Sequence, residues 1–154
     1  MKVQLNKSLE NINWFGCGPH ESYQDRKTAA AVGVYKGKVW EQYHPYVRPQ
    51  ETGNKCDVRW LELKSENNKG IRIKGLPLFD ANAQAFDTKL LNHKSSRDIR
   101  KHGNEISKGD VITLNIDLKQ MGVGGDTSWG ARTHPEYSIS SEELHFTFYI
   151  SPLQ

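Results

Sequence analysis

Short stretches in which apolar and polar residues alternate recur along the chain. This period of two is typical of a β-strand with one buried and one solvated face. It is clearest in two places near the end of the chain, at Ile112, Leu114, Ile116 and Leu118, and at Leu144, Phe146, Phe148 and Ile150. The pattern predicts further strands over residues 3–5, 12–15, 32–35, 39–43, 58–63 and 71–73.

Residues that favour tight turns separate these stretches at short intervals. They are Gly37, Gly53, Asn54, Asn67, Asn68 and Gly70. One short helix is predicted over residues 87–93, with Asp87 or Thr88 as its N-cap and Leu90 and Leu91 as its apolar face. We therefore predict an all-β fold, an antiparallel β-sandwich with at most one short helix.

The length of 154 residues predicts a single domain spanning residues 1–154. Only 36% of the residues are hydrophobic and a quarter are charged. Little apolar material is therefore present to offset the entropy of ordering the chain. This composition predicts a modest core, or a fragment that depends on another polypeptide for part of its packing.

Charge and cysteine content exclude several classes of protein. The net charge is +3, with both signs interspersed, so the basic stripe of a nucleic-acid-binding protein is absent. The short basic runs at residues 94–97 and 100–101 are typical of a solvated loop. Cys17 and Cys56 are too few for a disulfide scaffold and lack zinc-site spacing. With neither a signal peptide nor a membrane-spanning run in the sequence, we expect no membrane partner and favour a cytoplasmic location.

No complete catalytic motif is visible. The six histidines, His20, His44, His93, His102, His134 and His145, lack the spacing of a metal site. No Gly-x-Ser-x-Gly turn occurs. A glycosidase needs two carboxylates at a defined separation, and the sequence does not select a pair among 18 acidic residues.

The segment 121–130, MGVGGDTSWG, is the most distinctive candidate for a binding site. It fails as a phosphate-binding loop because no lysine follows the glycines. Its glycines allow a sharp turn, two polar residues can hydrogen-bond that turn, and a tryptophan stands at its end. These residues are Gly122, Gly124, Gly125, Asp126, Ser128 and Trp129. An exposed indole matches the C–H face of a pyranose; the alternative is that Trp129 caps the sandwich.

The remaining tryptophans have a simpler interpretation. Trp14, Trp40 and Trp60 lie in strand-like stretches, which favours packing in the core. Residues 14–30, WFGCGPHESYQDRKTAA, are rich in turn formers and charges, and are predicted to form an ordered loop held by Asp25 and Arg26.

Three segments together resemble the C-terminal, small-chain domain of the β-galactosidases of glycoside hydrolase family two. They are residues 14–30, residues 43–63 (YHPYVRPQETGNKCDVRWLEL) and residues 121–130. The first is similar to the family pattern of Trp, Gly-x-Gly-Pro, Glu, Tyr and Asp-Arg followed by Thr-Ala. The second resembles its Tyr-x-Pro-Tyr-x-x-Pro-x-Glu-x-Gly loop and the third its Met-Gly-x-Gly-Gly-Asp-x-Ser-Trp signature.

The resemblance implies a site and a larger assembly. Trp129 would form part of the platform on which a galactoside substrate binds, while the catalytic glutamates would lie in a separate barrel, so Glu21, Glu51 and Glu136 are not expected to be catalysts. The chain resembles the later part of that domain, which belongs to the galactose-mutarotase-like supersandwich folds. The parent enzyme would use Mg²⁺ and Na⁺ elsewhere, and we expect no metal or cofactor in this chain.

These observations lead to one main hypothesis and two alternatives. The chain is expected to be a non-catalytic part of a retaining β-galactosidase that acts on substrates such as lactose, inactive alone and paired with the rest of that polypeptide or with a partner chain. Half a sandwich exposes apolar faces and strand edges, which predicts self-association. The alternatives are a free-standing carbohydrate-binding module and a structural remnant in which Trp129 is buried against its own sheet.

Overall fold

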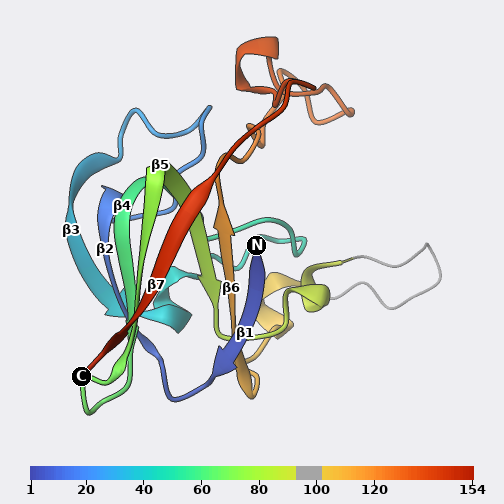
Figure 1. The fold of residues 1–154 in the computed structure, drawn as a ribbon. Coiled ribbons are helices and arrows are strands. Elements are labelled where there is room, and N and C mark those ends of the chain that lie inside the picture. The colour runs from blue at the N-terminus through green and yellow to red at the C-terminus, as the bar shows by residue number, and fades with distance from the viewer. Residues whose placement is uncertain (93–101) are drawn as a thin grey trace.

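The computed structural model describes residues 1–92 and 102–154, a part of the chain that contains seven β-strands. The strands are β1 (Lys2–Asn6), β2 (Asn11–Gly18), β3 (Ala31–Lys38), β4 (Lys55–Lys64), β5 (Gly70–Gln84), β6 (Val111–Asp117) and β7 (Thr147–Leu153). Short 3-10 helices are η1 (Val39–Gln42), η2 (Thr88–Leu91), η3 (Gly103–Glu105) and η4 (Pro135–Tyr137). All these strands join one antiparallel sheet (Figure 1).

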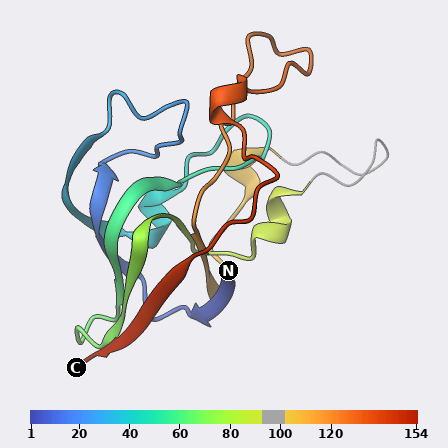
Figure 2. The same ribbon diagram turned by 45° about the horizontal axis from the view of Figure 1, so that its top comes forward.

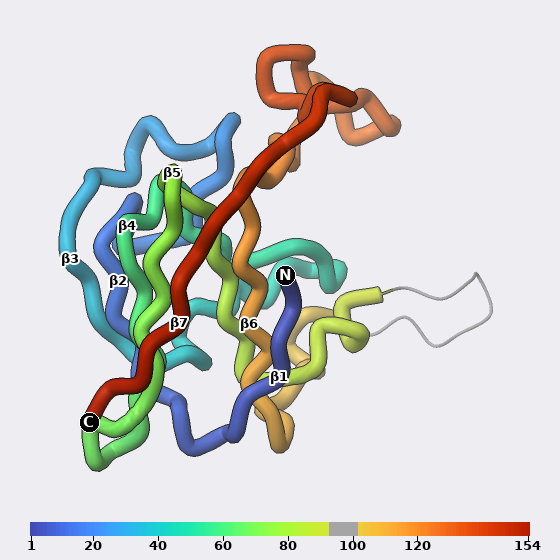
Figure 3. The backbone as a smooth tube through the Cα atoms, in the orientation of Figure 1, coloured from blue at the N-terminus to red at the C-terminus, as the bar shows by residue number. Residues whose placement is uncertain are grey.

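The strand order is β1-β6-β5-β4-β2-β3, and β7 pairs with β5 outside this order. The long strand β5 connects the two parts of the sheet. One of its edges pairs with β4, whereas the other is divided between β7, along residues 70–76, and β6, along residues 80–84. As a result, β7 runs obliquely across the front of the molecule in Figure 3.

The hydrophobic core lies on one face of this sheet, where alternate residues of neighbouring strands meet. Trp14 of β2 is paired with Leu61 of β4, which is paired with Ile73 of β5. All three are at most 1% exposed. The core continues onto β6 through Leu114, which pairs with Ala83. Burying one such large apolar side chain contributes about 1.5 to 3 kcal/mol, so the cross-strand rows account for the register of the sheet.

The opposite face of the sheet carries a second row, which we call the outer row. It crosses five strands, with register partners joined in the order Val34, Phe15, Trp60, Lys74 and Tyr149. Val34 is 66% exposed and Tyr149 is 58% exposed, while Phe15 and Trp60 are half-buried and meet edge to face, 6.5 Å between ring centroids. The outer row is therefore a partly apolar surface that the described residues leave open.

The predicted all-β class and antiparallel pairing are confirmed, residues 1–92 and 102–154 contain no long helix, and the sheet is consistent with one layer of a β-sandwich. The helix expected over residues 87–93 is the 3-10 turn η2, capped by Asp87, whose Oδ1 accepts from the Lys89 amide at 3.0 Å. It buries no residue, so the expected apolar face of Leu90 and Leu91 is wrong. His93 and the basic runs at 94–97 and 100–101 lie outside the described residues.

The strand predicted over residues 39–43 is also wrong, because η1 occupies that position. Two side-chain hydrogen bonds stabilise this 3-10 turn. Glu41 Oε2 accepts from the Lys38 amide at 2.9 Å, and Gln42 Nε2 donates to the Lys38 carbonyl at 3.1 Å. The last strand begins at Thr147 instead of Leu144. Core packing is right for Trp14, but Trp40 and Trp60 are only half-buried.

Candidate functional site

The segment between β6 and β7 carries Trp129 away from the sheet. Figures 1 and 2 both show it, in orange to red, extending beyond the ends of the strands. Trp129 lies in a turn and its side chain is 94% exposed. Gly130 follows with a φ of +96°, a conformation that residues with a side chain rarely adopt. The indole therefore does not cover the sheet.

Asp25 fastens the start of this segment, here called the Trp129 loop (residues 118–146), to the loop after β2. Its Oδ2 accepts from the Val123 amide at 3.0 Å and from the Gly124 amide at 2.9 Å. Because a carboxylate oxygen accepts both hydrogen bonds, they are charge-assisted and stronger than bonds between neutral groups. The loop predicted over residues 14–30 is only partly right, because residues 14–18 belong to β2 and residues 19–30 form the irregular segment.

Two of the three predicted glycines are required by close contacts. A Cβ at Gly122 would lie 2.3 Å from Thr133 Oγ1, and one at Gly125 would lie 2.3 Å from the Ala131 carbonyl oxygen. A Cβ at Gly124 would meet only Asp25 Oδ2, at 3.6 Å, an ordinary contact. Gly122 and Gly125 thus let two parts of the loop approach each other, whereas Gly124 is not sterically required.

The polar residues of the loop have unequal roles. Asp126 Oδ1 lies 2.8 Å from His134 Nε2, which closes the loop across eight residues. This hydrogen bond, with the negative charge of Asp126, raises the pKa of His134 above its usual value. Ser128 makes no hydrogen bond with the described residues. The expected local hydrogen bonding therefore holds for Asp126 and is wrong for Ser128.

A cleft of about 420 Å³ lies at the base of the Trp129 loop. Asp57, Asp80 and Glu136 contribute acidic groups to its wall, and Lys27 contributes an ammonium. Asp80 is 2% exposed, and its burial raises the pKa of its carboxyl to about 6. Sequence analysis missed Asp80 because nothing in its neighbourhood of alternating Asp, Ala and Asn marks it as buried.

The three glutamates excluded as catalysts serve local contacts in the structure. Glu21 accepts from the Gly53 amide at 2.7 Å and from the Tyr46 hydroxyl. Glu51 accepts from Asn82 Nδ2 at 2.6 Å, and Glu136 lies 3.8 Å from His134. Among residues 1–92 and 102–154, no group of three or more His, Cys, Asp or Glu side chains could hold a metal ion. That same part of the chain has no helix long and apolar enough to cross a membrane.

Comparison with known proteins points to one family. Residues 1–150 match the family described as beta galactosidase small chain. The chain is similar to a β-galactosidase of Priestia megaterium, with 41% identity over 99% of this chain and 14% of that protein. It is 36% identical to one of Vibrio cholerae over 88% of this chain and 12% of that protein, and 30% identical to one of Streptococcus thermophilus over 99% and 14%. The chain thus spans about one-seventh of the length of these relatives.

Proposed function

The chain belongs to the β-galactosidase small-chain family, and from this premise we propose that it is the part of a β-galactosidase that presents Trp129 to the substrate. The observation that carries the proposal is the 94% exposed indole, held on a loop that Asp25 and the Asp126–His134 contact brace. The substrates are terminal β-D-galactosides such as lactose.

An exposed tryptophan on a braced loop is suited to binding a sugar. The C–H face of a galactoside is apolar, so stacking on the indole removes apolar area from water while the hydroxyl groups remain free for hydrogen bonds. Because the Trp129 loop is tied down before the sugar arrives, less conformational entropy is lost on binding. Trp129 therefore contributes affinity and orientation, and other parts of the enzyme contribute the chemistry.

The chemistry of the whole enzyme requires groups outside this chain. A retaining glycosidase uses two carboxylates roughly 5 to 5.5 Å apart, one as nucleophile and one as acid and base. Glu21 and Glu51 are engaged in loop contacts here. We therefore propose that the catalytic glutamates belong to the rest of the polypeptide and that this chain alone is inactive.

The role of Trp129 can be tested by replacing it with alanine in a complete β-galactosidase that contains this chain. We expect KM for lactose to rise roughly three- to tenfold with little change in kcat, because a lost stacking contact of about 0.7 to 1.4 kcal/mol weakens binding of ground state and transition state alike.

Ser128→Ala is a matched control, since Ser128 is the exposed neighbour of Trp129 and makes no hydrogen bond with the described residues. It should leave both kinetic constants unchanged. Unaltered KM and kcat in the Trp129→Ala enzyme would refute the assignment.

A separate experiment tests whether β-galactosidase activity requires both this chain and the rest of the enzyme. Activity on a chromogenic β-galactoside is compared for this chain alone, for a β-galactosidase lacking the matching segment, and for the two mixed. Activity that is restored only in the mixture supports the proposal, whereas turnover by this chain alone contradicts it.

A further inference from the structure

A second cleft, of about 400 Å³, lies at the opposite end of the sheet from the Trp129 loop. It is bordered by the β1–β2 connection, η1 and the β4–β5 turn, which Figure 1 shows at the bottom of the molecule while the Trp129 loop is at the top. Its volume is within the range of about 300 to 1,000 Å³ that is usual for small-molecule sites. None of the residues assigned to the proposed function lines it.

Trp40 of η1 forms an aromatic wall of this cleft. Its ring is packed from behind by Tyr43, 5.6 Å between centroids, and by the edge of Phe86, at 6.3 Å. Tyr43 and Phe86 also contact each other at 5.2 Å. These contacts restrict the orientation of the indole although Trp40 is only half-buried. The result is a fixed aromatic surface, with its remaining area available to the cleft.

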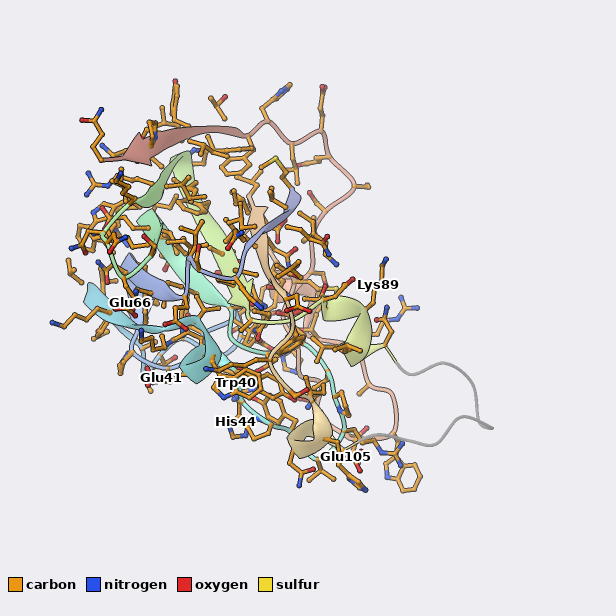
Figure 4. All side chains as sticks on the ribbon, turned by 90° about the horizontal axis from the view of Figure 1, so that it is seen from below. Trp40, Glu41, His44, Glu66, Lys89 and Glu105 are labelled. Carbon is orange, nitrogen blue, oxygen red and sulfur yellow. The ribbon has the colours of Figure 1, made fainter. Side chains whose placement is uncertain are left out.

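Two carboxylates line the same cleft as Trp40. Lys38 Nζ donates to Glu10 Oε1 at 2.9 Å and to Glu66 Oε1 at 2.7 Å, so one ammonium holds carboxylates from two different connections at the cleft wall. The contact with Lys38 keeps the pKa of Glu66 below its usual value. Both carboxylates have a further oxygen that can accept from a ligand hydroxyl. Figure 4 views this end of the molecule, with Trp40 and Glu66 labelled.

Lys108 supplies a donor at the same wall. Its Nζ lies over the Trp40 ring, 6.0 Å from the centroid, so a sugar that stacks on this face meets the ammonium directly. Lys108 makes no hydrogen bond or ion pair with the described residues. Lys7 is engaged by Asp110 at 2.8 Å. Because the carboxylates and ammonium groups of the cleft largely balance, the charge favours a neutral ligand over a strong anion.

From this combination we propose that the Trp40 cleft binds a neutral pyranoside. One face of the sugar stacks on the indole, its hydroxyls donate to Glu10 and Glu66, and Lys108 donates to a ring or hydroxyl oxygen. This site is distinct from the Trp129 loop and does not depend on the function proposed for it.

The test is a titration of the ¹⁵N-labelled 154-residue chain with methyl β-D-galactoside and with lactose, followed through the indole N–H signals of its four tryptophans. The Trp40 signal is identified by its loss in Trp40→Phe. We expect it to shift saturably with a Kd on the order of 1 mM. Backbone amide signals of the other cleft residues, which remain when the Trp40 indole is removed, should show at least tenfold weaker binding in Trp40→Ala. Glycerol at matched concentration should produce no saturable shift.

Glu66→Ala provides a variant that preserves the fold, because Glu66 is on the exposed β4–β5 turn and its side chain is 75% exposed. It should weaken sugar binding severalfold. Trp129→Phe should leave the response of Trp40 unchanged. No saturable shift of Trp40, or binding that survives Glu66→Ala and Trp40→Ala intact, overturns the proposal; a shift confined to Trp129 also overturns it, while supporting the separate role of that residue.

Discussion

At the scale of single residues, Asp80 is an acid that the fold removes from water. It is 2% exposed, and its carboxyl accepts from the Gln120 amide, 3.1 Å from Oδ2. Its folded pKa of about 6 is higher than the ordinary 3.8. The folded state therefore favours the protonated acid, and ionising Asp80 costs stability.

Replacing Asp80 with asparagine should change how stability depends on pH. Since the folded pKa of Asp80 is raised, the loss of stability from ionising its carboxyl is absent below about pH 4. This loss grows as the pH rises from about 4 to 6 and is fully present above about 6. A pKa raised from 3.8 to about 6 corresponds to a loss of at most about 3 kcal/mol in the free energy of unfolding. The free energy of unfolding of Asp80→Asn and of the unmodified chain is measured with urea at pH 4 and pH 7.5. We expect the substitution to be more favourable to stability at pH 7.5 than at pH 4.

Asp110→Asn is the control for this experiment, because the Asp110 side chain is 92% exposed and its pKa is lowered by Lys7 instead of raised. A loss of stability in Asp80→Asn that is the same at every pH would contradict a raised pKa of Asp80 in the folded chain.

At the scale of elements, the sequence predicted the strands whose apolar residues are large. Residues 112–118 and 58–63 match β6 and β4 closely. The end of β5, residues 80–84, was missed, since its apolar residues are the small Ala81 and Ala83 and its other residues are polar. Such a sequence has low β-propensity, and it forms a strand because neighbours on both sides hydrogen-bond it.

The sequence indicated the glycines and the tryptophan of the Trp129 loop, but it did not indicate that the loop is hydrogen-bonded to Asp25. The contact between Asp25 and the Val123 amide joins residues 98 positions apart, and no local pattern reports such a contact. The same limit explains Gly124, which resembles Gly122 and Gly125 in sequence but has room for a Cβ at ordinary contact distance, whereas they do not.

This difference predicts unequal effects of alanine within the loop. Gly125→Ala forces a Cβ against the Ala131 carbonyl and should distort the loop, whereas Gly124→Ala adds an ordinary contact. In a complete β-galactosidase, we expect Gly125→Ala to raise KM for lactose and to speed proteolysis of the loop, with little change in Tm because no strand is altered. Gly124→Ala should resemble the unmodified enzyme. Equal effects of the two substitutions would contradict this account.

At the scale of the whole molecule, the outer row is the surface most suited to a protein contact. Val34 and Tyr149 are exposed at the ends of a row that includes the half-buried rings of Phe15 and Trp60. The chain spans about one-seventh of its β-galactosidase relatives, so most of such a polypeptide is available to cover this face. We propose the rest of that polypeptide as the occupant, and self-association when it is absent.

A charge in the outer row should weaken both kinds of contact. Val34→Lys is expected to shift the isolated chain toward monomer in analytical ultracentrifugation at micromolar concentration, and to lower the Tm of the complete enzyme, because a buried ammonium is costly. Leu90→Lys, at a 43% exposed leucine on η2, is the control. A chain that is already monomeric before substitution, with sharp cooperative unfolding, would contradict self-association.

The pairing of β1 with β6 also has a consequence in time. Within the described residues β1 pairs with β6, and Lys2 is the register partner of Asn115, 113 residues later. A ribosome adds about 5 to 20 residues per second, so β1 waits roughly 6 to 23 s before its partner has been synthesised. During that interval the edge of β1 that pairs with β6 is open, and a chaperone or a neighbouring nascent chain can bind it.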